Sequence, residues 1–141
     1  MGNVYPRPED ILFHDGVYFS VEWYYTERGA LPALEYYRRM PEIDQHKLKL
    51  LVKYLADSPF GTRLPLSMYR IEDPDNRIFA FKPRGERFFN FTAEGSAVVI
   101  TNAYHKHSQK MTRQDREQLR LAVRCRQDYL RRVKEGSYYE A

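Results

Sequence analysis

Residues 77–111 read RIFAFKPRGERFFNFTAEGSAVVITNAYHKHSQKM, and this stretch decides the fold. It predicts three strands, at residues 78–82, at residues 87–92 and from residue 97 onward, which short turns rich in Gly, Pro and Glu separate. The last strand begins apolar on both faces, as a central strand of a sheet does. It then changes abruptly to two histidines and two lysines, so polar side chains meet solvent at this end of the sheet.

Upstream of this stretch, the pattern predicts one strand, two helices and a second short strand. Residues 17–24 alternate apolar and polar side chains, which is typical of a half-buried strand. One helix is expected from Pro32 to about Met40, because proline suits the first turn of a helix. Asp44 is expected to cap a second helix, and residues 67–72 are expected to form a short strand.

Downstream, the sequence predicts one long helix. Thr112 is its expected N-cap, with Asp115 in place of the usual Glu of a capping box, and Gly136 is expected to end it. Cys125 is interpreted as a small core residue. The expected buried stripe of this helix consists of Leu119, Ala122, Val123, Leu130 and Val133.

The order of these elements predicts an α+β fold. We expect a mostly antiparallel, twisted sheet of four to five strands, with an N-terminal helical hairpin and a C-terminal helix packed against it. Residues 1–16 are expected to form an irregular N-terminal arm, residues 17–135 the folded domain, and residues 136–141 a flexible tail.

The charge of the chain is mildly basic. Lys and Arg number 23 against 19 acidic residues, for a net charge of +4, and the excess is concentrated between Lys82 and Lys134. The single cysteine excludes an internal disulfide. No apolar run is long enough to span a bilayer, and the charges and prolines of residues 1–15 argue against a signal peptide. We therefore expect a cytoplasmic protein with no membrane partner.

The polar strand end carries the candidate chemistry. Alternation along the last strand places His105 and His107 on one face and Lys106 on the other. Lys82 and Arg87 lie at the ends of neighbouring strands, so pairing of these strands is expected to gather the cations at one place. Such a cluster can bind a phosphate and stabilise developing charge, and histidine can transfer a proton at neutral pH. RNA supplies its own nucleophile, the 2′-hydroxyl group.

Other interpretations of the same residues remain open. Lys and His beyond a strand end are commonly solvated loop residues. The two histidines have no carboxylate or cysteine nearby in sequence, so neither a metal nor a cofactor is expected. Arg116, Arg120 and Arg124 recur at a spacing of four, which fits either a solvated helix face or nonspecific contacts with phosphates.

The order and spacing of these motifs resemble the RelE/HigB-like toxin superfamily, in its phage-derived branch. In that branch an aromatic strand, a strand that begins with Arg, and an apolar strand with a Lys-rich end precede a helix. The matching segments here are residues 78–82, residues 87–91 and the motif YHKHSQKMT at residues 104–112. The resemblance covers residues 17–133, and the helical hairpin after the first strand also fits it.

This resemblance implies a RelE-like fold and a type II toxin that cleaves mRNA without metal, often on the ribosome, by attack of the 2′-hydroxyl on the adjacent phosphate. By position, Arg87, Lys106 and Lys110 would bind the phosphate or stabilise its transition state. His107 stands where the family commonly has a second Lys, and its role as base, acid or neither stays open. The candidate RNA-binding residues are Lys82, Arg84, His105, Arg116, Arg120 and Arg124. The implied partners are mRNA, the ribosome and an antitoxin protein, often one with a helix-turn-helix.

Two alternatives belong to other classes of function. The chain is either a non-catalytic module that binds RNA or the ribosome, or a phage-derived module that binds a protein through its aromatic surface. The second of these predicts a neutral sheet edge, with Lys106 and Arg87 far apart.

Overall fold

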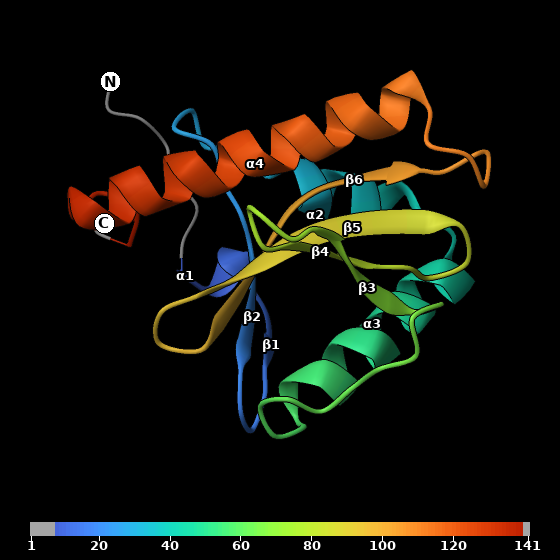
Figure 1. Cartoon of the computed structure of the whole chain (residues 1–141). Coiled ribbons are helices and arrows are strands. Elements are labelled where there is room, and N and C mark those ends of the chain that lie inside the picture. The colour runs from blue at the N-terminus through green and yellow to red at the C-terminus, as the bar shows by residue number, and fades with distance from the viewer. Residues whose placement is uncertain (1–7, 140–141) are drawn as a thin grey trace.

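The computed structural model describes residues 8–139 and confirms the α+β class. In chain order the elements are α1 (Pro8–Ile11), β1 (Leu12–Asp15), β2 (Ser20–Trp23), α2 (Pro32–Arg39), α3 (Glu42–Ala56), β3 (Tyr69–Asp73), β4 (Ile78–Phe81), β5 (Glu86–Ala93), β6 (Ala97–His105) and α4 (Arg113–Lys134). Figure 1 shows the strands as one twisted sheet with helices on both sides. Within residues 8–139, no helix combines the length and the apolar character needed to cross a membrane.

The sheet has six strands in the order β1-β2-β6-β5-β4-β3. Four of the neighbouring pairs are antiparallel, but β2 and β6 run parallel, with Ser20 opposite Ala97 and Trp23 opposite Ile100. The expectation of four to five mostly antiparallel strands is therefore wrong in number, and the sheet is mixed. The chain leaves β2 through two helices and three strands before it returns beside it, which gives the long crossover that a parallel pair requires.

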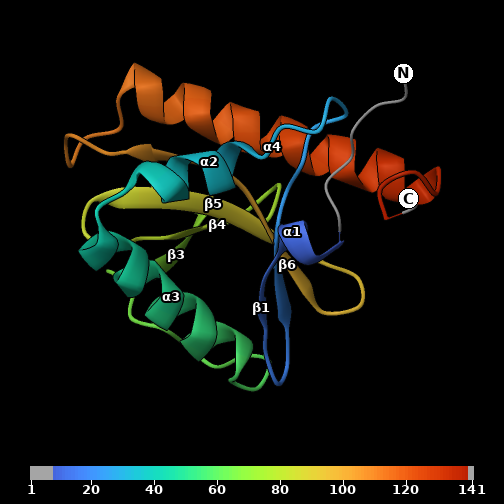
Figure 2. The same cartoon turned by 180° about the vertical axis from the view of Figure 1, so that it is seen from behind.

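Each face of the sheet is covered by helices. Helices α2 and α3 cover one face and α4 covers the other (Figures 1 and 2). The central strand β6 is buried on both sides, as its apolar sequence predicts: Val98 and Ile100 pack towards α2 and α3, and Val99 packs towards α4. Burial of these side chains removes apolar area from water on both faces, which is the main stabilising contribution to such a layered fold.

Part of the expected irregular arm is ordered. Residues 8–15 form one helical turn and the edge strand β1, in which Leu12 pairs with Glu22. The Phe13 ring stacks on the Trp23 indole with centroids 4.4 Å apart, and this contact fixes the strand on the sheet. The expectation for residues 1–7 lies outside the described residues.

The turn between β1 and β2 approaches the end of α3 very closely. A Cβ atom added at Gly16 would lie 2.5 Å from the Ala56 Cβ and 2.7 Å from the Ala56 carbonyl oxygen. That carbonyl also accepts hydrogen bonds from the backbone N–H groups of Tyr18 and Phe19, at 2.8 and 3.0 Å. Neither side of this contact can move freely, because the Ala56 carbonyl is backbone and the Ala56 Cβ is bonded directly to the backbone.

Gly16→Ala is therefore expected to lower the free energy of unfolding by about 1–3 kcal/mol, as overpacking does. Denaturation with urea measures the change. The neighbouring variant Val17→Ala is the control, because Val17 is 77% exposed and its truncation is expected to cost less than about 0.5 kcal/mol. Equal stability of Gly16→Ala and the unmodified chain would contradict this close approach.

The predicted starting residues of the helices agree with the structure for two of the three predicted helices. Helix α2 begins at Pro32 as expected, and α4 has the full capping box between Thr112 and Asp115. Helix α3 begins at Glu42 instead of after Asp44, because the Pro41 carbonyl already accepts the Asp44 N–H at 3.0 Å. The predicted cap at Asp44 is wrong, and this residue lies in the first turn.

The buried stripe of α4 is only partly as predicted. Ala122 and Cys125 are buried, but Leu130 and Val133 are 41% and 40% exposed. In the last turns, the buried side chains are those of Tyr129 and Arg132 instead. At the start of the helix, Asp115 is also buried. A tyrosine and an arginine take the buried positions because aromatic partners surround them.

The segment after α4 folds back onto the sheet. Tyr138 is 2% exposed, and its ring lies 4.6 Å from the ring of Tyr129. The Arg132 guanidinium lies over the rings of Tyr25 and Tyr138, and it donates a hydrogen bond to the Tyr25 carbonyl at 2.7 Å. Residues 136–139, which are expected to belong to a flexible tail, therefore pack against the folded domain, and residues 140–141 lie outside the described residues.

Candidate functional site

Two adjoining cavities open between the sheet and the start of α4. The first, of about 220 Å³, is lined by Arg87, Tyr104, Lys106 and Asp115, among others. The second, of about 460 Å³, is lined by Lys82, Arg84, Arg87, Lys106 and His107, together with small and polar residues. Because Arg87 and Lys106 line both, we treat the two cavities as one site and call it the cationic pocket.

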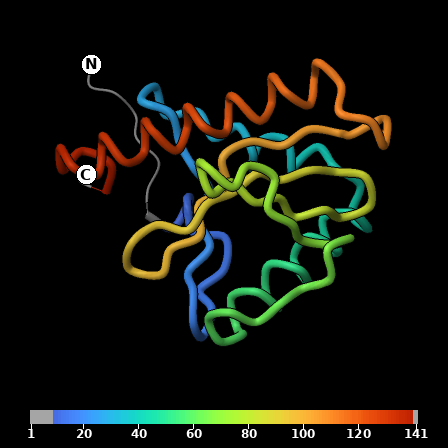
Figure 3. The backbone as a smooth tube through the Cα atoms, viewed as in Figure 1, coloured from blue at the N-terminus to red at the C-terminus, as the bar shows by residue number. Residues whose placement is uncertain are grey.

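Strand pairing brings these side chains together. Arg87 on β5 lies directly opposite Tyr104 on β6. The Lys106 N–H donates to the Gly85 carbonyl at 2.9 Å, which continues the pairing past the end of β6. Lys82 follows β4, and its N–H donates to the Met68 carbonyl at 2.8 Å. The chain then forms the loop of residues 106–112, which extends beyond the sheet before α4 begins (Figure 3).

A buried carboxylate holds Lys106 in place. The Lys106 ammonium donates to an oxygen of Asp115 at 2.6 Å, and the Tyr104 hydroxyl donates to the other oxygen at 2.6 Å. The side chains of Lys106 and Asp115 are only 15% and 5% exposed. Burial by itself raises the pKa of the Asp115 carboxyl, but hydrogen bonds from Lys106, Tyr104 and Thr112 outweigh it and hold that pKa well below its usual range. Asp115 is therefore ionised, and it compensates the charge of Lys106.

Two cations of the pocket are not compensated in this way. Within residues 8–139, neither Lys82 nor Arg87 has a carboxylate within ion-pair distance. Burial lowers the pKa of the Lys82 ammonium, and the positive charges of Arg70 and Arg87 lower it further. The Arg87 guanidinium donates one hydrogen bond, to the Glu86 carbonyl at 3.0 Å, and has other N–H groups left for an anion.

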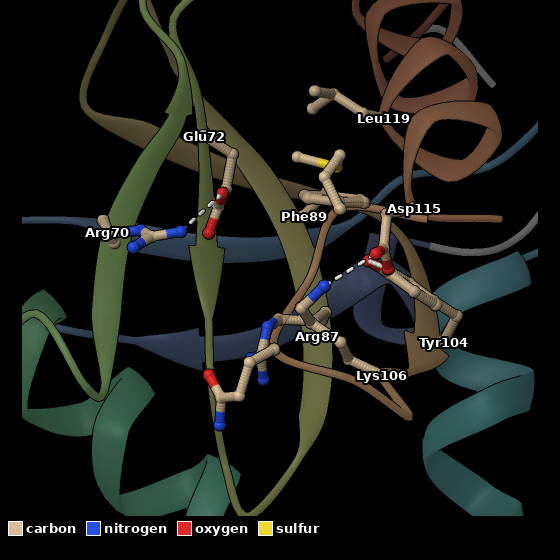
Figure 4. A pocket seen from close by; sticks show the side chains of 10 residues that line it. Arg70, Glu72, Arg87, Phe89, Tyr104, Lys106, Asp115 and Leu119 are labelled. Atoms are coloured by element: carbon tan, nitrogen blue, oxygen red, sulfur yellow. Dashed lines mark hydrogen bonds and ion pairs between the residues drawn. The ribbon is translucent and has the colours of Figure 1, made fainter. Parts of the chain in front are cut away.

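The opposite wall of the first cavity contains residues that the sequence did not single out. Arg70 and Glu72 on β3 form an ion pair at 3.3 Å. Figure 4 shows this pair on one side of the cavity and the Lys106–Asp115 pair on the other, with Arg87 between them. In the sequence, Arg70 and Glu72 alternate with apolar side chains, which places them on one face of a strand. This pattern indicates a functional site only once β3 is known to lie two strands from β5.

His105 lies on the α2 side of the sheet end, away from Asp115, whereas His107 lies in the loop after β6. His105 Nδ1 lies 2.9 Å from an oxygen of the buried Glu86, and the Tyr36 hydroxyl donates to the same carboxylate. The expected alternation holds for His105 and Lys106 but does not extend to His107, because β6 ends at His105. The rings of His105 and His107 meet edge to face at 4.7 Å. Only His107 of these two lines the second cavity. A Cβ atom at Gly85, whose φ is +86°, would lie 3.3 Å from the His105 ring, so both the conformation and the contact favour glycine there.

The remaining candidates lie elsewhere. Lys110 accepts a hydrogen bond from the Lys106 ammonium through its carbonyl oxygen, and its exposed side chain is outside the lining of the cationic pocket. Arg84 lines the second cavity and forms an ion pair with Asp44 at 3.3 Å. Three arginines lie exposed on α4 and outside the lining of both cavities: Arg116, Arg120 and Arg124.

The described residues therefore form a site that can bind an anion through Arg87 and Lys82, beside a rigid Lys106–Asp115 pair. Among residues 8–139, no group of three or more His, Cys, Asp or Glu side chains is arranged to hold a metal ion. No protein-family model matches the chain, and no curated protein has a significantly similar sequence.

Proposed function

We propose that this protein is an mRNA endoribonuclease of the type II toxin kind, which binds one RNA phosphodiester in the cationic pocket and cleaves it without a metal. The observation that carries the proposal is the pair of uncompensated cations, Arg87 and Lys82, in a cavity open to solvent. Guanidinium and ammonium groups without carboxylate partners are the groups that a phosphate attracts most strongly. The Lys106–Asp115 ion pair also lines the pocket and holds Lys106 in position there.

The order of the elements adds support for a RelE-like fold. After α1 and β1, strand β2 is followed by the helical pair α2–α3, then by four consecutive antiparallel strands, then by one helix. The basic signature at residues 104–112 links the central strand β6 to that last helix. From β2 onward, this order is consistent with the one that the resemblance to the RelE/HigB-like superfamily implies, and α1 and β1 are additional to it.

The proposed reaction begins with attack of the ribose 2′-hydroxyl oxygen on the adjacent phosphorus. A new P–O2′ bond forms, the P–O5′ bond breaks, and the products are a 2′,3′-cyclic phosphate and a 5′-hydroxyl end. Arg87 and Lys82 stabilise the charge that develops on the phosphate oxygens. The 2′-hydroxyl loses one proton and the departing 5′ oxygen takes up one proton, so the protons balance. His107, a histidine that lines the second cavity, is the group proposed to carry this proton transfer.

The partners follow from this activity. The substrate is mRNA, on the ribosome or free, and a cognate antitoxin protein keeps the nuclease inactive in the cell. A protein-interaction module would instead have a neutral sheet edge and would separate Lys106 from Arg87. Here both residues line the same cavities, so the RNA-directed function is better supported.

The test is cleavage of mRNA by the purified protein in the presence of EDTA, both alone and in a translating extract. We expect cut RNA with 2′,3′-cyclic phosphate and 5′-hydroxyl ends in at least one of these settings. Substitution of 2′-deoxyribose at the cut position should block the reaction, because the nucleophile is then missing. Products with 3′-hydroxyl ends, or intact RNA in both settings, would contradict the proposal.

A non-catalytic RNA-binding module is the second candidate, and one specific contact favours it. The Lys106 ammonium is held 2.6 Å from Asp115, so it is less available to a reacting phosphate than the resemblance implies. Such a module would bind RNA with a steep dependence on salt and leave it intact even in a translating extract. The cleavage experiment separates the two candidates directly.

A further inference from the structure

An apolar groove lies next to the cationic pocket, between α3 and the segment that precedes β3. It has a volume of about 600 Å³, and its apolar lining includes Leu50, Tyr54, Pro65 and Met68. The side chains of Leu50, Tyr54 and Met68 are 52%, 55% and 42% exposed. We call it the apolar groove. An exposed apolar surface of this kind beside a polar site is typical of a ligand-binding surface.

The groove and the cationic pocket are continuous. Ser67, Lys82 and Arg84 line both the groove and the second cavity of the pocket. Lys47 adds a third cation to the rim of the groove, and among residues 8–139 no carboxylate lines it. A single ligand that extends from one site into the other would therefore meet cations first and an aromatic and aliphatic surface next.

A nucleotide of single-stranded RNA has this distribution of chemistry. Its phosphate is anionic, and its base is a flat group that stacks on aromatic rings with little regard to sequence. An apolar segment of an acidic protein also fits cations around an apolar surface. The continuity of the groove with the pocket favours RNA, because Lys82 lines both sites. In a nucleotide, the phosphate and the base are joined through a single ribose, so both can be bound side by side.

We propose that the apolar groove is a nucleobase subsite, in which Tyr54 stacks on the base of a nucleotide next to the phosphate that Arg87 and Lys82 bind. The inference rests on the proposed function and deepens it, since it assigns a subsite for the strand that is cut. Because the groove offers an aromatic and aliphatic surface, stacking dominates there and the subsite accepts more than one kind of base.

The test is the affinity of the protein for short single-stranded RNA that carries a 2′-O-methyl group at every ribose and so cannot be cut. Fluorescence anisotropy compares an intact oligonucleotide with a series that has one abasic residue at each position in turn. Tyr54→Ala is expected to weaken binding of the intact oligonucleotide about tenfold, which corresponds to about 1.4 kcal/mol. Tyr54→Phe should keep the affinity, because the ring remains.

The series also shows whether Tyr54 and a base interact. At one abasic position the unmodified protein should lose about tenfold in affinity, and Tyr54→Ala should lose nothing further there. Tyr18→Ala is the matched control, because Tyr18 is similarly exposed, at 48%, and lies outside the lining of the groove; its affinity should stay unchanged.

Two outcomes would overturn the inference, and they are distinguishable. If Arg87→Ala weakens binding but Tyr54→Ala does not, the phosphate site stands, the base subsite is wrong, and an apolar protein segment becomes the occupant to test. If the unmodified protein does not bind the intact oligonucleotide even at low salt, both the subsite and the proposed function are wrong.

Discussion

Arg87→Ala is expected to lower the rate of RNA cleavage by about a hundredfold to a thousandfold, which is the usual cost of removing one group that stabilises charge in a transition state. The Arg87 guanidinium lines both cavities of the cationic pocket and has no carboxylate partner within residues 8–139. Its one hydrogen bond to the part of the chain that the structure describes is to the Glu86 carbonyl, so the truncation is expected to leave the fold intact. The rate of mRNA cleavage, with the same RNA and the same buffer, measures the effect.

Two further variants control for this result. Arg87→Lys keeps the charge but loses the planar fork of donors, so it should retain part of the activity. Arg39→Ala removes an exposed arginine from α2, on the other face of the sheet, and should cleave like the unmodified protein. Equal loss in Arg39→Ala and Arg87→Ala would mean that net charge, and not the pocket, determines activity.

Asp115→Ala is expected to lower the free energy of unfolding by about 3–5 kcal/mol at neutral pH, because it leaves a largely buried ammonium without its partner. The same carboxylate accepts hydrogen bonds from Lys106, Tyr104 and the Thr112 N–H, so one of the two hydrogen bonds of the α4 capping box is lost as well. Thermal or urea denaturation measures the loss. Asp75→Ala, which removes an exposed aspartate in the turn after β3, should differ little from the unmodified chain.

The dependence on pH identifies the cause of this loss. The pKa of Asp115 is depressed in the folded protein, so its contribution to stability is present above the unfolded value of about 4 and is lost as pH falls below it. Asp115→Asn should therefore lose less stability than the unmodified chain between pH 5 and pH 2. An identical acid dependence of the two proteins would show that the carboxylate is not held by these contacts.

The sequence predicts the local structure well wherever one short segment contains the whole signal. The capping box at Thr112 and Asp115, the strands around Arg87 and the doubly buried β6 all follow from spacing and side-chain type. The side of the sheet on which His105 and Lys106 lie follows from strand alternation alone.

The contacts between distant segments could not be predicted in this way. The parallel pairing of β2 with β6 depends on how the chain returns to residue 97, and no local pattern encodes it. Arg70 and Glu72 enter the site only through the pairing of β3 with β4 and of β4 with β5. The burial of Arg132 depends on its contact with Tyr138, which lies beyond the end of α4. Gly136 separates the two residues, and a glycine at this position predicts the end of the helix and no packed segment after it.

The same limit applies to the candidate site. Position in the signature gives Lys106 and Lys110 equal weight, but the structure separates them, because Asp115 orients Lys106 into the pocket while the Lys110 side chain stays exposed. The compensation of Lys106 by a buried carboxylate reduces its charge at the pocket. It leaves Arg87 and Lys82 as the principal phosphate contacts of the proposed nuclease.

The central claim is that these two cations bind an RNA phosphate, and the most direct measurement is the affinity of Arg87→Ala for uncleavable RNA over a range of salt concentrations. We predict weaker binding at low salt than for the unmodified protein, and a slope of log affinity against log salt that is shallower by about 0.7, as the loss of one phosphate contact with a single strand requires. An unchanged affinity and an unchanged slope would contradict the claim, because the guanidinium at position 87 would then contact no phosphate.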